Sequence, residues 1–477
     1  MRPGMGMAVS TARRASAMWR RWTEAIHPHR LPLAVVLLAC ALGQLAVLTQ
    51  RPLAWLSQDS GDYIHVAERI LTTHQVIDAY RTPGYPLLLA LIFSLAGGER
   101  FDAVALVQAA LIVLAAGELY VLSYRVCRQR WLAATVAAVT GLNVFATSWE
   151  RVVMTETLAY WLVVTLFLVF ERYLRSARAR YLIAFVLLSG MAIMTRPIFI
   201  LLPALLLLVL GVWAARTRSL VRHWKALALT GALIYGFVLA YMGANGLING
   251  YYGLSDATNI LLFGKVLRFD MYALPLSGSG QRYAQLQVEI ERHVAASGLL
   301  NREPWGFVAE HPTYAGDHLA VLGAFSRAEI AQHPLYFAEQ SLTDVRLGFY
   351  AGPDLYAPAP YAPLWITALY ALYRFYARVF GFFPLLFLAV GVWVWRRPEQ
   401  VGTVVCFTAL LAYAELTLIA TVTSYEGFWR LRFPIEWGVT LVGTITLVAV
   451  VRGLARALAR WRGRPVAPLA AGSGGER

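Results

Sequence analysis

The feature that most constrains this chain is a series of long apolar runs separated by short basic segments. Hydrophobic residues make up 58% of its 477 positions, and charged residues only 14%. A water-soluble protein of this size cannot bury that share of apolar side chains, whereas a run of about 20 apolar residues can cross a bilayer as one helix. The sequence therefore predicts an all-α polytopic membrane protein.

Ten apolar runs are candidates for membrane-spanning helices. They are 31–50, 103–124, 131–148, 156–171, 181–195, 197–214, 225–245, 376–395, 401–422 and 433–451. The first run follows a basic tail, as a signal peptide does, but it is longer than the usual core of about 7–15 residues and no clear cleavage site follows. We therefore expect about ten transmembrane helices, some of them short.

The basic residues predict the orientation of these helices. The net charge is +15, but the arginines and lysine gather in every other connection between apolar runs. They are Arg125, Arg128, Arg130; Arg172, Arg175, Arg178, Arg180; Arg216, Arg218, Arg222, Lys225; Arg396, Arg397; and Arg452, Arg456, Arg460, Arg462, Arg464. Cytoplasmic loops carry such an excess, so the charge indicates an inner or plasma membrane protein rather than one that binds nucleic acid.

This orientation divides the chain into five predicted parts. They are a cytoplasmic basic tail (1–30), an N-terminal membrane module (31–245), an extracytoplasmic subdomain (246–375), C-terminal membrane helices (376–451) and a cytoplasmic tail (452–477). The external loop 52–102 has helical periodicity, and its apolar stretch 86–97 is too short to span, so we expect external juxtamembrane helices there.

The subdomain 246–375 is rich in aromatic residues. They include Tyr251, Tyr252, Trp305, Tyr314 and Tyr350. Such rings can stack on sugars, but they are equally typical of a belt at the membrane interface. The sequence leaves both interpretations open.

Three carboxylates stand where apolar runs begin or end on the predicted external side. Asp59 and Asp62 lie three apart in SQDSGDYIHVAERI (57–70), and Glu156 begins the fourth run. One interpretation is structural: Asp59 is a suitable N-cap, and an acid in a first helical turn is stabilised by about 0.3–1 kcal/mol. The other is chemical, because a carboxylate can accept a proton from a hydroxyl group.

Four arginines are predicted on the same face: Arg81, Arg196, Arg430 and Arg432. Arg81 lies in RTPGYP, where Pro83 and Gly84 predict a rigid turn. Two of them have ordinary explanations: Arg81 as a residue near the lipid headgroups, and Arg196 as a charge at a helix end. Together with the carboxylates, they favour transfer from a phosphate-linked donor to an alcohol, because guanidinium groups bind phosphate.

Four motifs resemble a known superfamily in their order and spacing. They are QDSGDY (58–63), RTPGYPLLLAL (81–91), MTETLAYW (154–161) and MTRPIFILLP (194–203). Over residues 31–215 the chain is similar to the GT-C superfamily of membrane glycosyltransferases. The branch it resembles includes dolichyl-phosphate-mannose protein mannosyltransferases and lipid A aminoarabinose transferases. WRLRFPIEW (429–437) is a looser match.

The resemblance implies a GT-C-like fold and an enzyme that moves a sugar from a polyprenyl phosphate to a hydroxyl acceptor on a lipid, glycan or protein. Attack on the sugar from the face opposite the phosphate predicts inversion, and the charge pattern predicts that the site lies outside the cytoplasm. The resemblance also implies that Asp59 is the base and Asp62 its partner or an acceptor contact, although the two roles can be exchanged. Glu156 matches the acid at the start of the fourth span. The implied phosphate-binding positions are Arg81, Arg196, Arg430 and Arg432.

The sequence leaves alternatives open both for the use of a metal ion and for the function. Two residues separate Asp59 and Asp62, which departs from the Asp-x-Asp signature of the superfamily, and His65 is the one histidine near them. Metal-independent chemistry is therefore favoured, with a divalent metal left open and no other cofactor expected. The alternatives are a transporter or flippase of lipid-linked sugars, suggested by Glu118 and Glu415 within apolar runs, and an O-antigen ligase or polymerase.

Overall fold

The computed structural model describes residues 29–50, 52–143, 151–297, 303–349, 383–397, 399–425 and 428–461, with isolated positions between 364 and 371. Over these residues the secondary structure is helical, apart from one isolated bridge between Trp55 and Val152. The all-α prediction is confirmed. Most of the two predicted tails and the 350–363 stretch with Tyr350 lie outside the described residues.

Seven described helices are long and apolar enough to cross a membrane. The elements concerned are α2 (Arg30–Gln50), α5 (Phe101–Cys127), α8 (Glu156–Ser176), η2 (Pro197–Ile200) with α10 (Leu202–Arg216), α11 (Leu220–Asn249), α19 (Val401–Thr423) and α21 (Glu436–Trp461). The chain is therefore a multi-pass integral membrane protein.

The other predicted spans form shorter helices within the described residues. They are α6 (Arg130–Gly141), α9 (Ala179–Thr195) and α18 (Phe383–Arg396). The run predicted at 131–148 is shorter than expected, because α6 ends at Gly141. Its last residues lie outside the described part of the chain.

The basic connections lie together at one end of the bundle. Arg452 donates to Gln129 Oε1 at 2.8 Å, and Arg175 donates to the carbonyl oxygen of Arg125 at 2.7 Å. Arg216 likewise donates to the carbonyl oxygen of Trp395 at 3.1 Å. These contacts join connections that the alternating charge pattern assigns to one side of the membrane.

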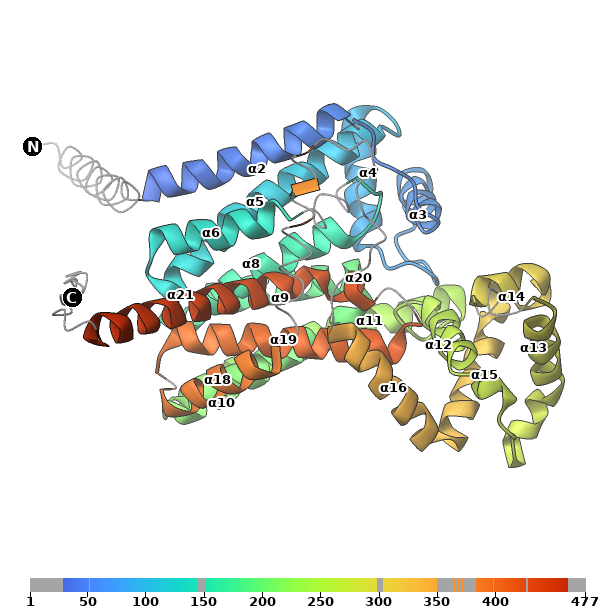
Figure 1. The fold of residues 1–477 in the computed structure, drawn as a ribbon. Helices are drawn as coiled ribbons and strands as arrows, with labels where there is room; N and C mark the ends of the chain where they lie inside the picture. The colour runs from blue at the N-terminus through green and yellow to red at the C-terminus, as the bar shows by residue number, and fades with distance from the viewer. Residues whose placement is uncertain are drawn as a thin grey trace, which may run out of the picture.

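The opposite end of the bundle carries the helices that were predicted to be external (Figure 1). The first loop forms α3 (Ser60–Thr73) and α4 (Gly84–Ala96), and α20 (Phe428–Arg432) with η10 (Phe433–Ile435) precedes α21. In Figure 1 the start of α2 and the end of α21 lie at the left, whereas α3 and α12 to α15 lie at the right. The loops with the candidate site residues therefore share the end that carries the subdomain.

The subdomain has a hydrophobic core of its own. Its helices are α12 (Ala257–Arg268), η3 (Met271–Ala273), η4 (Gly278–Tyr283), α13 (Ala284–Ser297), α14 (Pro304–Glu310), η6 (Pro312–Tyr314), η7 (Gly316–His318), α15 (Leu319–Gln332) and α16 (Pro334–Phe349). Phe263, Phe307 and Phe325 are fully buried together there, in a cluster distinct from the core of the bundle. The exact domain boundaries remain a prediction.

Candidate active site

Asp59 stands at the N-cap of α3 but does not cap it. Its side chain makes no hydrogen bond to the helix backbone. The Ser60 hydroxyl instead accepts from the Ser57 N–H at 2.8 Å and donates to the Val153 carbonyl at 2.9 Å, which ties the start of α3 to the segment before α8. Helix capping therefore does not explain why an aspartate occupies position 59, because its carboxylate does not bind the helix backbone.

Arg81 binds both aspartates of the first loop. Its Nη2 donates to Asp59 Oδ1 at 2.9 Å and to Asp62 Oδ2 at 2.8 Å, and its Nε donates to the same Asp62 oxygen at 3.2 Å. The guanidinium carbon lies 4.7 Å from the centre of the Tyr63 ring and 4.6 Å from that of Tyr80. These contacts hold the two carboxylates at fixed positions around one cation.

Asp78 positions the backbone that carries Arg81. Its Oδ1 accepts from the N–H groups of Tyr80 and Arg81 at 2.8 and 2.6 Å, as the side chain of a turn-forming aspartate does. Its Oδ2 pairs with Arg69 at 2.5 Å. Asp78 was not among the predicted site residues, and its contribution depends on these backbone hydrogen bonds.

Gly84 allows the same turn to pack against the end of α9. A Cβ at this position would lie 2.6 Å from the backbone of Met194 and Thr195. No side chain fits in that space without a backbone shift, so the RTPGYP motif needs glycine here. The contact brings the Arg81 turn close to Arg196, which follows α9 directly.

Glu156 is the buried centre of a second set of ion pairs. Its side chain is fully buried, and Oε1 accepts from Arg430 Nε at 2.5 Å. Arg196 Nη1 lies 3.3 Å from the same oxygen. Arg430 also donates from Nη2 to Asp59 Oδ2 at 3.1 Å. Asp59 thus links the two sets, because each of its oxygens contacts a different arginine.

We call this group the arginine–carboxylate cluster. Its six members are Asp59, Asp62, Arg81, Glu156, Arg196 and Arg430. Three guanidinium groups and three carboxylates balance in charge, although they come from four separate segments of the chain. The sequence analysis placed all six on one face.

Arg432, the seventh predicted site residue, makes its described contacts with residues outside the cluster. Its Nε donates to Glu436 Oε1 at 3.2 Å, its guanidinium lies 5.5 Å from the Tyr413 ring centre, and its side chain is fully buried within the bundle. Two residues along a helix differ by about 200° in direction, so Arg430 and Arg432 face different ways. The phosphate contact expected at Arg432 stays a prediction, because its described contacts are with Glu436 and Tyr413.

The arginines control the charge of Asp59. Burial raises the pKa of this carboxyl group, but Arg81 and Arg430 outweigh burial and hold the pKa below its ordinary value of 3.8. The carboxylate is therefore ionised at neutral pH. Asp62 is more exposed than Asp59: 45% of its side chain is accessible, against 33% for Asp59. Its ion pair with Arg81 is made through Oδ2.

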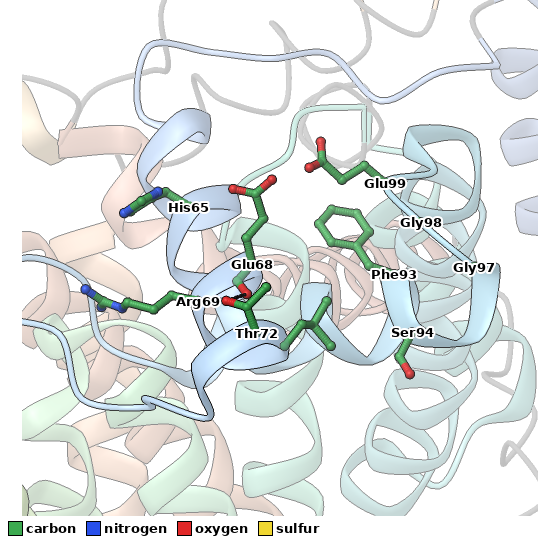
Figure 2. A pocket seen from close by; sticks show the side chains of 10 residues that line it. His65, Glu68, Arg69, Thr72, Phe93, Ser94, Gly97, Gly98 and Glu99 are labelled. Atoms are coloured by element: carbon green, nitrogen blue, oxygen red, sulfur yellow. Dashed lines mark hydrogen bonds between the residues drawn. The ribbon is translucent and has the colours of Figure 1, made fainter.

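A cavity of about 780 Å³ opens between α3 and α4, and none of the six cluster residues lines it. In Figure 2, Glu68 from α3 and Glu99 after α4 point toward one another across it, with Phe93 below them. A hydrogen bond with Glu68 raises the pKa of Glu99. Arg69 also lines the cavity and pairs with Asp78. The cavity thus adjoins the residues that position Arg81.

The aromatic residues of the subdomain have different surroundings. Trp305 packs edge-on against Tyr80, next to Arg81, with ring centres 6.1 Å apart. Tyr314 donates to Glu289 at 2.8 Å, and Tyr251 donates to the Ser255 carbonyl. Tyr252 is 70% exposed. Among these rings, Trp305 is therefore the one in contact with a neighbour of the cluster.

This chain is similar in sequence and in structure to known proteins. Residues 80–241 match the family model described as dolichyl-phosphate-mannose-protein mannosyltransferase. This match confirms the resemblance that the motifs indicated. The matched range contains Arg81, Glu156 and Arg196, whereas Asp59 and Arg430 lie outside it.

Solved structures of membrane glycosyltransferases are also similar. The archaeal oligosaccharyltransferase AglB from Archaeoglobus fulgidus is 13% identical, with a TM-score of 0.47, over 94% of this chain and 53% of that protein. ArnT from Cupriavidus metallidurans bound to undecaprenyl phosphate is 15% identical, with a TM-score of 0.36, over 89% of this chain and 78% of that one. This chain spans about half the length of AglB. No curated protein matched the sequence.

Proposed function

We propose that this chain transfers a sugar from a polyprenyl-phosphate donor to a hydroxyl acceptor on the extracytoplasmic side of the membrane. The observation that carries the proposal is the arginine–carboxylate cluster, in which ionised carboxylates and guanidinium groups meet at one end of a membrane-embedded bundle. The match to a family of lipid-phosphate-dependent mannosyltransferases supports the class of donor.

In the proposed step, a carboxylate of the first loop accepts the proton of the acceptor hydroxyl. The hydroxyl oxygen forms a bond to the anomeric carbon as the bond from that carbon to the phosphate oxygen breaks. The electron pair leaves with the polyprenyl phosphate, and attack from the opposite face inverts the anomeric centre. No strong general acid is required, because a phosphate monoester is already a tolerable leaving group.

Asp59 and Asp62 are the candidates for the proton acceptor. Asp59 has both oxygens in arginine contacts, which hold it ionised but also weaken it as a base. Asp62 is the more exposed of the two. We assign Asp59 as the base, consistent with the family resemblance, and Asp62 as its partner or as an acceptor contact.

Arg81, Arg196 and Arg430 are proposed to bind the donor phosphate. A hydrogen-bond donor positioned to stabilise the negative charge that develops in the transition state lowers the activation barrier by about 3–4 kcal/mol. Because these arginines already pair with carboxylates, an incoming phosphate has to share them or displace a carboxylate. Release of Asp59 from Arg430 by the phosphate would strengthen the base when the donor arrives.

The extracytoplasmic side is inferred from the arrangement of charge. The basic connections gather at one end of the bundle, and the cluster lies with the subdomain at the other. Under the positive-inside rule the first end faces the cytoplasm. Gln58→Cys, in a chain without its three native cysteines, should react with a membrane-impermeant maleimide on intact cells, whereas Arg128→Cys should react only after permeabilisation.

The proposal is tested with purified protein in nanodiscs, supplied with a lipid extract of the host membranes and candidate acceptors. We expect free polyprenyl phosphate to form with the wild-type chain, and Asp59→Asn to reduce its rate by about 10²–10⁴-fold. Binding of undecaprenyl phosphate by the variant should persist. An unchanged rate in both Asp59→Asn and Asp62→Asn would refute the assigned chemistry, and movement of lipid-linked sugar across vesicles without bond cleavage would favour the flippase.

A further inference from the structure

A second group of chemically active side chains lies in the subdomain, away from the cluster. His293 belongs to α13, Glu310 is the last residue of α14, and His311 follows it. Among the described residues, these three side chains place potential metal-ligand atoms within 4.8 Å of one another. Nδ1 of His293 lies 2.8 Å from Glu310 Oε2.

One ring nitrogen of the buried His293 imidazole lacks a hydrogen-bond partner among the described residues. The residue is only 3% exposed, and its Nε2 is buried with no hydrogen-bond partner among the residues the structure describes. Most buried polar atoms in proteins have a partner, and one without a partner costs free energy. Because Nδ1 already faces Glu310, a cation bound at Nε2 would supply the one partner that the described protein groups do not give this ring.

Phe307 holds both imidazoles in place. Its fully buried ring lies edge-on to His293, with centres 5.3 Å apart, and stacks on His311 at 4.5 Å. Pro312 restricts the backbone of His311, which precedes it. Rings oriented by packing before any ion arrives are the arrangement that a metal site requires.

We propose that His293, Glu310 and His311 bind one divalent transition-metal ion of the zinc class. Two imidazoles and a carboxylate, with water in the fourth position, suit tetrahedral zinc, whereas calcium and magnesium prefer oxygen ligands throughout. Ligand atoms around tetrahedral zinc lie about 3.4 Å apart. The potential ligand atoms of the three side chains lie within 4.8 Å of one another, so small side-chain movements would bring them to that spacing.

The ion would tie α13 to the end of α14, which are joined through residues 298–302. Tyr314 and Glu289 already connect the same two regions through a hydrogen bond of 2.8 Å. The inference does not depend on the proposed function, because no member of the arginine–carboxylate cluster takes part. It also leaves open whether the sugar-transfer site itself uses metal.

The experiment measures zinc bound to the full-length protein in detergent after removal of any affinity tag and dialysis against EDTA. Metal-free protein is titrated with ZnCl₂, desalted and assayed by mass spectrometry of the element. We expect about one equivalent for the wild-type chain. Glu310→Gln and His311→Gln should weaken binding at least about tenfold, because even groups behind the ligands change metal affinity about 10–100-fold.

His318→Gln is the matched control, since His318 is an exposed histidine of the same subdomain. The His318→Gln variant should still bind about one equivalent of zinc. Glu310 is 57% exposed at its side chain, so its substitution tests the site without disturbing the core. Substitution by Co²⁺ adds a spectroscopic readout, with visible absorption of a tetrahedral site in the wild type and its loss in Glu310→Gln. Equal zinc binding by the wild type, Glu310→Gln and His311→Gln overturns the proposal.

Discussion

Arg430 and Arg432 lie two residues apart in α20, yet they belong to two different regions of the molecule. Arg430 reaches Asp59 and Glu156, which are distant in sequence, and its side chain remains 28% exposed. Arg432 pairs with Glu436, one helical turn along, and is fully buried. The first pairing joins separate segments at an accessible surface, as a binding site requires. The second is local and enclosed, as a structural pair is.

Arg432→Met should have the largest effect of the changes that separate these two regions. It leaves Glu436 as a buried carboxylate without its salt-bridge partner, which typically costs about 3–5 kcal/mol in the free energy of unfolding. Unfolding in detergent measures this loss. Arg432→Met combined with Glu436→Met should recover most of the stability, and failure to recover would mean that Arg432 has a role beyond this pair.

Arg430→Met should act on the reaction instead of the fold. We expect the rate of polyprenyl phosphate formation to fall by about 10²–10³-fold, because a placed donor to the developing charge is lost. Stability should change less than in Arg432→Met, since Glu156 keeps Arg196. Arg346→Met, at an exposed position of α16, is the control and should leave the rate unchanged. A stability loss equal to that of Arg432→Met would remove the distinction between the two arginines.

Gly84→Ala tests whether the arginine–carboxylate cluster depends on the close packing of the Arg81 turn against the end of α9. The added Cβ would meet the backbone before Arg196, so we expect about 1–3 kcal/mol of destabilisation and a lower rate as the Arg81 turn shifts. Gly61→Ala is the matched control within α3, because nothing lies within 4 Å of its Cβ position. Equal behaviour of the two variants in unfolding and rate assays would show that the turn tolerates movement.

The smallest expected effect is that of pH on the wild-type chain. The pKa of Asp59 lies below 3.8, because Arg81 and Arg430 outweigh burial, so its charge persists above that value and is lost only as the pH falls through the lowered pKa. Titration of Asp59 should therefore change the rate less than about twofold between pH 7 and pH 5. In Arg430→Met the acidic decline should move to higher pH. A decline in rate at the same pH in the wild-type chain and in Arg430→Met would argue against the contact between Arg430 and Asp59.

The predictable part of the site followed from local signals. Apolar run length indicated spanning helices, and alternating basic connections placed the loops of Asp59, Arg81, Glu156 and Arg196 on one side. Asp78 was missed because its role depends on hydrogen bonds to backbone groups two and three residues later, which composition does not reveal. Local sequence did not separate Arg430 from Arg432, because the two share one neighbourhood in sequence while their described partners differ.

The sequence by itself determined the class of fold and the side of the bundle on which each charged loop lies, because apolar length and charge bias act locally along the chain. Only the tertiary structure decided which charges meet. Asp59 and Arg430 are separated by more than three hundred residues, and their contact depends on the helix packing and on the rotation of α20. The same packing brought His293 to His311, a proximity that no motif signals.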